Sequence, residues 1–288
     1  MITCAAVQTN PVLADRRANL TMSLHLIEEC ASNGARLIVF PECSLTGYCF
    51  DGRGEAESVA EEIPGPSTEV LAAKARETNT YIVAGLLERE DDRLYNAAVL
   101  IGPEGAVRHS YRKTHLPGLG VDRFADPGEG PLEVVETDIG RVGILICYDL
   151  FFPEPARALM LKGMDLLLLP TNWPVGREAN PDFVVKCRAR ENHVYVAATN
   201  RAGEERGTRF FGRSQICDPE GRVLGEAAPD APDVLYAEID PRSSREHHVV
   251  LRPGEFEPDL MKDRRPELYG ALTEELGVEA PARPGSGG

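Results

Sequence analysis

Short apolar runs alternate with helical patterns along the first half of this chain, and the alternation ends in a tight hairpin turn. An apolar run around Val7 is followed by apolar residues at helical spacing between 20 and 31, and then by a second run at 37–40. A helix is predicted over about 66–78. Three strands follow, near 81–86, 96–101 and 106–111, and the last two flank a Gly-Pro-Glu-Gly turn.

The second half repeats this order of elements without repeating the sequence. Its predicted elements are a strand at 141–146, a helix from Pro153, a strand at 166–169, a helix at about 181–192, a strand at 194–199 and a hairpin turn at 218–221. Alternating strands and helices predict an α/β fold, with two sheets packed together and helices outside. We place one domain at 1–270 and a C-terminal tail at 271–288, whose Gly-rich end we expect to be mobile.

Charge and composition exclude several classes of function. The chain has 46 acidic and 31 basic residues, a net charge of −15, which argues against nucleic acid as a partner. No apolar run reaches the roughly 18 residues of a membrane span, and the N-terminus lacks a signal-peptide pattern, so we expect a cytoplasmic protein and no membrane partner. The histidines and seven cysteines show no metal-ligand spacing, and no glycine-rich phosphate loop occurs, so we expect no metal and no cofactor.

Three chemically useful side chains follow predicted strand ends, where reactive groups collect in α/β sheets. Glu42 follows the strand ending at Phe40, Lys113 follows the hairpin, and Cys147 follows the strand ending at Ile146. A carboxylate can take the proton of a thiol, and an ammonium can stabilise charge on an attacked carbonyl oxygen. Taken separately, each residue has a structural interpretation as a packing, capping or surface group, and spacing alone does not show that the three meet.

The segments that carry these residues resemble the Glu, Lys and Cys motifs of the nitrilase superfamily, the carbon–nitrogen hydrolases, in order and in separation. They are Phe40-Pro41-Glu42, Tyr111-Arg112-Lys113-Thr114-His115-Leu116 and Ile146-Cys147-Tyr148-Asp149, with further likeness at Gly47-Tyr48, Leu94-Tyr95-Asn96, Pro127-Gly128-Glu129, Phe152-Pro153-Glu154, Arg188–Asn192 and Asp263-Arg264-Arg265. The resemblance runs from about residue 2 to 270. It implies a four-layer α-β-β-α sandwich and a homodimer or higher homo-oligomer whose subunits pair through helical faces.

The resemblance also implies catalytic roles. Cys147 would be the nucleophile that forms a thioester, and Glu42 the general base that later activates water. Lys113 would stabilise the tetrahedral intermediate, helped by the backbone N–H of Tyr148. Many family members carry a second glutamate in the loop after the lysine. This loop has no glutamate before Glu129, so we take Asp122 as the replacement; the alternative is a loop aspartate paired with Arg123 or solvent.

The residues after the nucleophile favour one reaction. Nitrilases proper usually show Cys-Trp-Glu, whereas this chain has Cys147-Tyr148-Asp149, which is more similar to the small-amide hydrolases of the superfamily. The resemblance therefore implies hydrolysis of a small aliphatic carboxamide by water to the acid and ammonia. The alternatives are an N-carbamoyl amine or amino-acid hydrolase, and a nitrilase.

Substrate contacts are predicted from position. Tyr48 follows the Glu42 loop, and Asn172 and Trp173 follow the strand at 166–169, so all three belong near the same edge. Trp173 would wall a small pocket, with core packing as the alternative, and we add Tyr148 to this set.

The sequence also predicts positions for residues outside the proposed catalytic and substrate-binding set. We expect Phe151 in the core and a buried ion pair of Glu191 with Arg188 or Arg190 that supports the site. Side chains alternate along an extended segment, so Cys43 should point away from Glu42.

Overall fold

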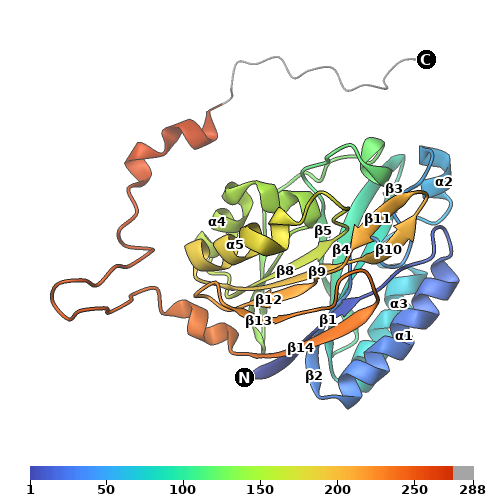
Figure 1. Ribbon diagram of the computed structural model, residues 1–288. Coiled ribbons are helices and arrows are strands. Elements are labelled where there is room, and N and C mark those ends of the chain that lie inside the picture. Colours follow the sequence, from blue (N-terminus) through green and yellow to red (C-terminus); the bar gives the residue numbers. More distant parts are fainter. Residues whose placement is uncertain (275–288) are drawn as a thin grey trace. The chain divides into compact units, whose positions relative to one another are not determined.

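The computed structural model describes residues 1–274. Met1–Glu246 form one compact unit, and the chain from His247 onward belongs to a second unit. The first unit contains two six-stranded sheets, whose strand orders are β14-β1-β2-β3-β4-β5 and β13-β12-β9-β8-β7-β6. The four-layer α/β fold predicted from the sequence is confirmed (Figure 1).

The first sheet contains mainly the strands of the first half. Its strands are β1 (Ile2–Gln8), β2 (Ala35–Val39), β3 (Tyr81–Glu90), β4 (Arg93–Gly102), β5 (Ala106–Arg112) and β14 (Asp233–Ile239). The second sheet contains β6 (Val134–Thr137), β7 (Gly140–Ile144), β8 (Leu166–Thr171), β9 (Tyr195–Asn200), β12 (Gln215–Cys217) and β13 (Val223–Glu226). A separate two-stranded hairpin is formed by β10 (Ala202–Glu205) and β11 (Thr208–Phe211).

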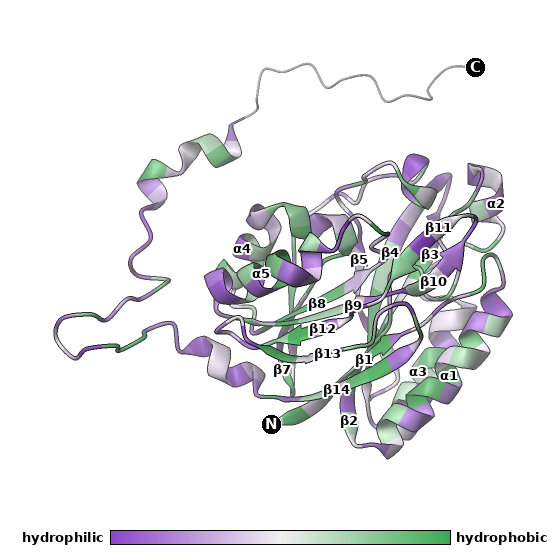
Figure 2. Ribbon diagram, in the orientation of Figure 1, coloured by the Kyte–Doolittle hydropathy of each residue, from purple (hydrophilic) through white to green (hydrophobic). Residues whose placement is uncertain are grey.

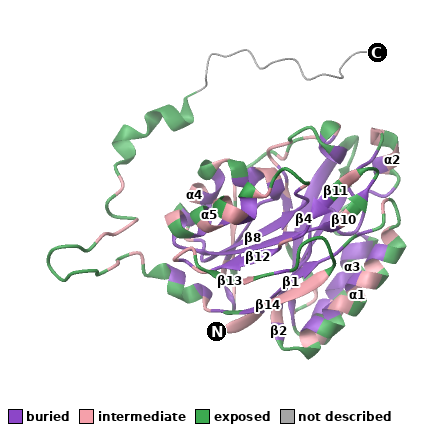
Figure 3. Cartoon of the chain, viewed as in Figure 1, coloured by how far each residue is buried: buried purple, intermediate pink, exposed green. Residues whose placement is uncertain are grey.

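Helices cover the outer faces of the sheets. They are α1 (Arg16–Ser32), α3 (Pro66–Thr78), α4 (Pro153–Leu161) and α5 (Val185–Asn192), whereas the short α2 (Arg53–Glu57) packs with the loop after β2. In Figure 1, α1 and α3 lie on one side of the molecule and α4 and α5 on the other. The strands between them are largely hydrophobic and buried, whereas the helices turn polar, exposed surfaces outward (Figures 2 and 3). This is the arrangement that amphipathic helices on apolar sheets require.

Alternation along the strands separates two cores. Cys4 and Ala6 of β1 belong to a cluster that also contains residues of the second sheet, so this cluster fills the space between the sheets. Their neighbours Ala5 and Val7 belong to a second cluster, together with residues of α1 and α3. The parity of a residue in its strand therefore decides whether its side chain faces the other sheet or a helix.

The predicted elements of both halves are present, but four strands were missed in the sequence. β6 and β14 are the edge partners of β7 and β1, and the hairpin β10–β11 lies outside both sheets. β14 pairs antiparallel with β1 from Ile2↔Ile239 to Gln8↔Asp233, so it joins the far end of the unit to its beginning. Such pairing over a long sequence separation carries no local signal.

The second unit, as far as it is described, contains isolated bridges and two short 3₁₀ helices, Pro266–Leu268 and Gly270–Thr273. Residues 275–288 of the predicted tail lie outside the described residues, and the domain limits of 1–270 stay a prediction. Among residues 1–274, no helix combines the length and the apolar character needed to cross a bilayer.

Candidate active site

Glu42 reaches the site because the chain after β2 crosses over a glycine of β3. Phe40 continues the pairing, with its N–H donating to Val83 O at 2.8 Å. The next residues pass directly over Gly85, where an added Cβ would lie 2.4 Å from Cys43 N and 2.6 Å from Pro41 O. The absence of a side chain at Gly85 therefore lets this segment lie against β3.

Lys113 and Asn96 are cross-strand neighbours at one end of the antiparallel pair of β4 and β5. β4 and β5 pair antiparallel with Ala97 opposite Arg112, and Lys113 N–H donates to Asn96 O at 2.8 Å. Asn96 shares the parity of Ala98 in β4, which faces the space between the sheets. The register therefore places both polar side chains between the two sheets.

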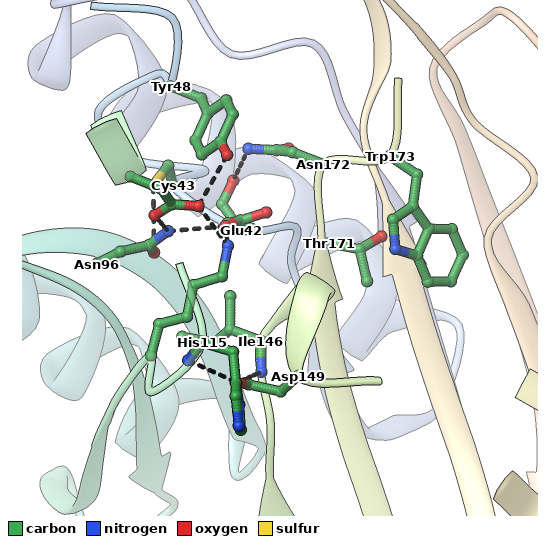
Figure 4. Close-up of polar contacts among 12 residues, drawn as sticks. Glu42, Cys43, Tyr48, Asn96, His115, Ile146, Asp149, Thr171, Asn172 and Trp173 are labelled. Carbon is green, nitrogen blue, oxygen red and sulfur yellow. Dashed lines mark hydrogen bonds and ion pairs between the residues drawn. The ribbon is translucent and has the colours of Figure 1, made fainter. Parts of the chain in front are cut away.

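A buried ion cluster forms where these segments meet (Figure 4). Lys113 Nζ lies 2.6 Å from Glu42 Oε1 and 2.6 Å from Asp122 Oδ2, and none of the three side chains is exposed. Asp122 comes from the 3₁₀ helix Gly120–Arg123. The alternative pairing with Arg123 is not formed, because that guanidinium donates to the carbonyls of Gly120 and Phe50.

Two further residues complete this cluster. Asn96 Nδ2 lies 2.7 Å from Glu42 Oε1 and 2.9 Å from Asp122 Oδ1, and Tyr48 Oη donates to Asp122 Oδ2 at 2.8 Å. Tyr48 is therefore a neighbour of Asp122 rather than of Glu42. Sequence reasoning gave Asn96 no function, although its Leu-Tyr-Asn segment and its strand parity were available signals.

Glu42 Oε2 is the carboxylate oxygen of this cluster that accepts no hydrogen bond within the described part of the chain. Burial raises the pKa of Glu42 above its ordinary value, and the Asp122 charge adds to this, against the opposing effect of Lys113. Burial disfavours the charged form of Lys113, but Asp122 and Glu42 outweigh it, so the pKa of Lys113 lies well above its ordinary value. The site thus contains a charged ammonium and a carboxylate with raised proton affinity.

Cys147 begins a 3₁₀ helix, Cys147–Phe151, shortly after β7. Its φ of 48° is left-handed, an unusual backbone conformation for a residue other than glycine. Burial raises the pKa of its thiol well above the ordinary value; Glu42 adds to the rise and Lys113 opposes it. The resting form is therefore a neutral thiol, within electrostatic reach of both residues.

The carboxylate of Asp149 anchors the turn that carries Cys147. It is fully buried and accepts from Ile146 N at 2.9 Å, Tyr111 Oη at 2.9 Å and Thr114 Oγ1 at 3.0 Å. The neighbouring His115 also lies with Nδ1 2.7 Å from this carboxylate. Asp149 therefore ties the Cys147 turn to the segment that carries Lys113.

Of the two residues that follow β8, Asn172 makes polar contacts in the site, whereas Trp173 packs in the core. Asn172 Nδ2 donates to Glu42 O at 3.0 Å, and the Asn172 backbone lowers the pKa of the Cys147 thiol against the larger effect of burial. The Trp173 indole is 1% exposed and belongs to the core between the sheets. Figure 4 shows this ring turned away from Glu42, which favours the core-packing alternative for Trp173.

An aromatic group lies beside the nucleophile turn. The partly exposed Tyr148 ring contacts Phe151 and Phe152 at centroid distances of 5.0 and 5.4 Å, and Phe152 stacks on His115 at 4.0 Å. The prediction of a core position for Phe151 is wrong, because 38% of this residue is exposed. The 3₁₀ helix turns that ring toward the surface, next to Arg177.

The prediction for Cys43 is also wrong. Residue 43 has a left-handed φ of 49°, so the segment is not extended and the alternation rule does not apply. Its thiol instead lies 3.4 Å from Asn96 Oδ1, beside the cluster. The predicted ion pair of Glu191 is formed with Arg188, at 2.8 Å, but it is not buried, because 31% of the Glu191 side chain is exposed. Arg188 Nε also donates to Leu150 O, which supports the Cys147 turn.

The chain is similar to known proteins over most of its length. The family model for carbon-nitrogen hydrolase matches residues 3–248. A nitrilase of Pyrococcus abyssi is 40% identical over 93% of this chain and 99% of its own length. An omega-amidase of Danio rerio is 34% identical over 87% of this chain and 90% of its own length.

A solved structure adds chemical detail about a more distant relative. It is a variant of the amidase of Nesterenkonia sp. AN1, described as showing covalent addition of the acetamide moiety of fluoroacetamide at the active-site cysteine. It superposes with a TM-score of 0.79 at 26% identity, over 94% of this chain and 96% of the amidase chain. Among residues 1–274 of this chain, no group of three or more His, Cys, Asp or Glu side chains is arranged to hold a metal ion.

Proposed function

Because the chain belongs to the carbon–nitrogen hydrolase family, as an amidase-type hydrolase, we propose that it hydrolyses a small aliphatic carboxamide to the acid and ammonia through a thioester on Cys147. The observation that carries this proposal is the unpartnered, buried Glu42 Oε2 beside a charged Lys113. A base needs a free oxygen to accept a proton, and the ammonium stabilises the negative charge that develops next to it.

The first half of the reaction transfers the acyl group to sulfur. Glu42 takes the thiol proton of Cys147 while the sulfur attacks the carboxamide carbon. Lys113 and the backbone N–H of Tyr148 donate to the resulting oxyanion. As this intermediate collapses, the C–N bond breaks, protonated Glu42 gives its proton to the leaving nitrogen, and ammonia departs.

The second half returns the enzyme to its resting form. Glu42 takes a proton from water, and the hydroxide formed attacks the thioester carbon. The C–S bond then breaks, the acid is released, and the thiolate recovers its proton from Glu42. Lys113 remains protonated throughout, because two buried carboxylates surround it.

The identity of the substrate rests on two supports. The Cys147-Tyr148-Asp149 segment resembles the small-amide branch, and the structural relative described above is an amidase whose active-site cysteine carries the acetamide moiety of fluoroacetamide. The 40% identity with a protein named nitrilase makes a nitrile substrate the second candidate. An N-carbamoyl substrate and a homodimer or higher homo-oligomer stay predictions.

The test is ammonia release from a panel of small aliphatic amides, N-carbamoyl compounds and nitriles. Wild type is compared with Cys147→Ala and with Cys187→Ser, a control at the exposed cysteine of α5. We expect release from amides by wild type and Cys187→Ser, and none by Cys147→Ala. Turnover retained in Cys147→Ala would overturn the mechanism, and release from nitriles or carbamoyl compounds alone would transfer the proposal to that class.

A further inference from the structure

The side chain of Asn96 is placed between the two acidic groups of the site, and all of its polar atoms are used. Its amide nitrogen carries two N–H bonds and lies 2.7 Å from Glu42 Oε1 and 2.9 Å from Asp122 Oδ1. Its oxygen accepts from the Cys43 thiol at 3.4 Å. Because Asn96 is fully buried, no water takes over these bonds at low cost.

The donors are shared unequally between the two carboxylates. Asp122 accepts three bonds that occupy both of its oxygens, from Asn96, Lys113 and Tyr48. Glu42 accepts two bonds, from Asn96 and Lys113, and both end on Oε1. The carboxylate with a free oxygen is therefore the one suited to accept a proton.

We propose that Asn96 is a positioning residue that gives the two carboxylates different roles. Its N–H groups hold Asp122 in place as a counter-ion, and they orient Glu42 so that Oε2 is presented to Cys147 as the base. This inference rests on the proposed function, since it presumes a reaction that begins with proton transfer from Cys147. It goes further by naming the group that separates a base from a counter-ion within one buried cluster.

The effect of Asn96 on Glu42 has a definite sign. The amide donates to the ionised form of Glu42, which lowers the pKa of that carboxyl against the larger effect of burial. The titratable groups that interact electrostatically with Glu42 are Lys113, Asp122, Cys43, Tyr48 and Cys147. Loss of the amide would leave these groups in place and make Glu42 harder to ionise.

Two variants separate positioning from simple packing. Asn96→Ala removes both donors, and Asn96→Asp keeps the volume but places a third carboxylate between the other two. Asn192→Ala is the matched control, because Asn192 is equally buried and donates to Arg188 O at the end of α5. Thermal unfolding of all variants shows whether they are folded. If Asn96→Ala does not fold, Asn96→Asp is used as the test variant.

The measurement is the rate of iodoacetamide alkylation of Cys147 as a function of pH, followed by peptide mass spectrometry in a Cys187→Ser background. On the acid side, the pH at which the alkylation rate falls should rise by about one unit in Asn96→Ala and by more in Asn96→Asp. In Asn192→Ala this pH should equal that of the wild type. An unchanged pH in folded Asn96 variants would overturn the inference. Alkylation breaks the C–I bond of iodoacetamide and leaves its C–N bond intact, so the inference can stand or fall independently of whether the enzyme hydrolyses an amide.

Discussion

Lys113 Nζ lies 2.6 Å from Asp122 Oδ2, and both side chains are fully buried. An aspartate can make this contact because its loop packs tightly on Tyr48, whose carbonyl accepts from Val121 N at 2.8 Å. Gly120, with a left-handed φ of 55°, has no room for a side chain, since a Cβ there would lie 2.6 Å from the Tyr48 ring. The close approach of this loop to Tyr48 leaves the Asp122 carboxylate within hydrogen-bond distance of Lys113.

Asp122→Asn should lower turnover by about 10²-fold, since it removes half of the negative charge around Lys113 and changes an acceptor into a donor. The measurement is steady-state kinetics on the best amide of the panel. Asp51→Asn, at a side chain that is 84% exposed, is the control and should retain wild-type rates. A loss of less than threefold in Asp122→Asn would return this residue to a structural role.

The rate of the reaction should fall on the acid side with an apparent pKa above the ordinary glutamate value of 4.5, because burial raises the pKa of Glu42. Activity requires ionised Glu42, so it is present above this pKa and is lost as the pH falls through it. The check is the pH profile of kcat/KM. An acid limb at or below pH 4.5 would exclude Glu42 as the titrating base.

Gly85→Ala should destabilise the fold by about 1–3 kcal/mol and abolish most of the activity. The added Cβ would collide with the backbone at Pro41 and Cys43 and push Glu42 away from Lys113. Gly54→Ala in α2 is the matched control, because nothing lies within 4 Å of its Cβ position. Chemical unfolding and ammonia release measure the two effects, and a Gly85→Ala enzyme with both values unchanged would refute the crossing geometry.

Asp149→Asn should reduce activity and cost about 1–3 kcal/mol of stability. The amide nitrogen of asparagine would face one of the donors Ile146 N, Tyr111 Oη or Thr114 Oγ1, leaving a buried N–H or hydroxyl without an acceptor. We expect slower alkylation of Cys147 together with a lower unfolding temperature. A folded variant that alkylates at the wild-type rate would show that the turn holds its shape without this carboxylate.

Much of the fold was predictable because its signals are local. The helix predicted over about 66–78 agrees with the observed α3, which a Gly-Pro pair begins and Asn79, in a left-handed conformation, ends. The hairpin turns at 102–105 and 218–221 followed from Gly and Pro in short loops. The edge strand β14 was missed because it pairs with β1 at the other end of the unit, and β6 was missed because its four half-exposed residues form too short a pattern beside β7.

The sequence by itself determined the alternation of strands and helices in both halves, the family, and the positions of Glu42, Lys113 and Cys147 at strand ends. Only the tertiary structure decided which groups surround them, because those contacts depend on strand register, on the backbone crossing at Gly85 and on loop closure. Register turned Asn96 toward Lys113, loop packing brought Asp122 to the same ammonium, and left-handed turns redirected Cys43 and Cys147. These are relations between distant segments, and a linear pattern of residue types does not encode them locally.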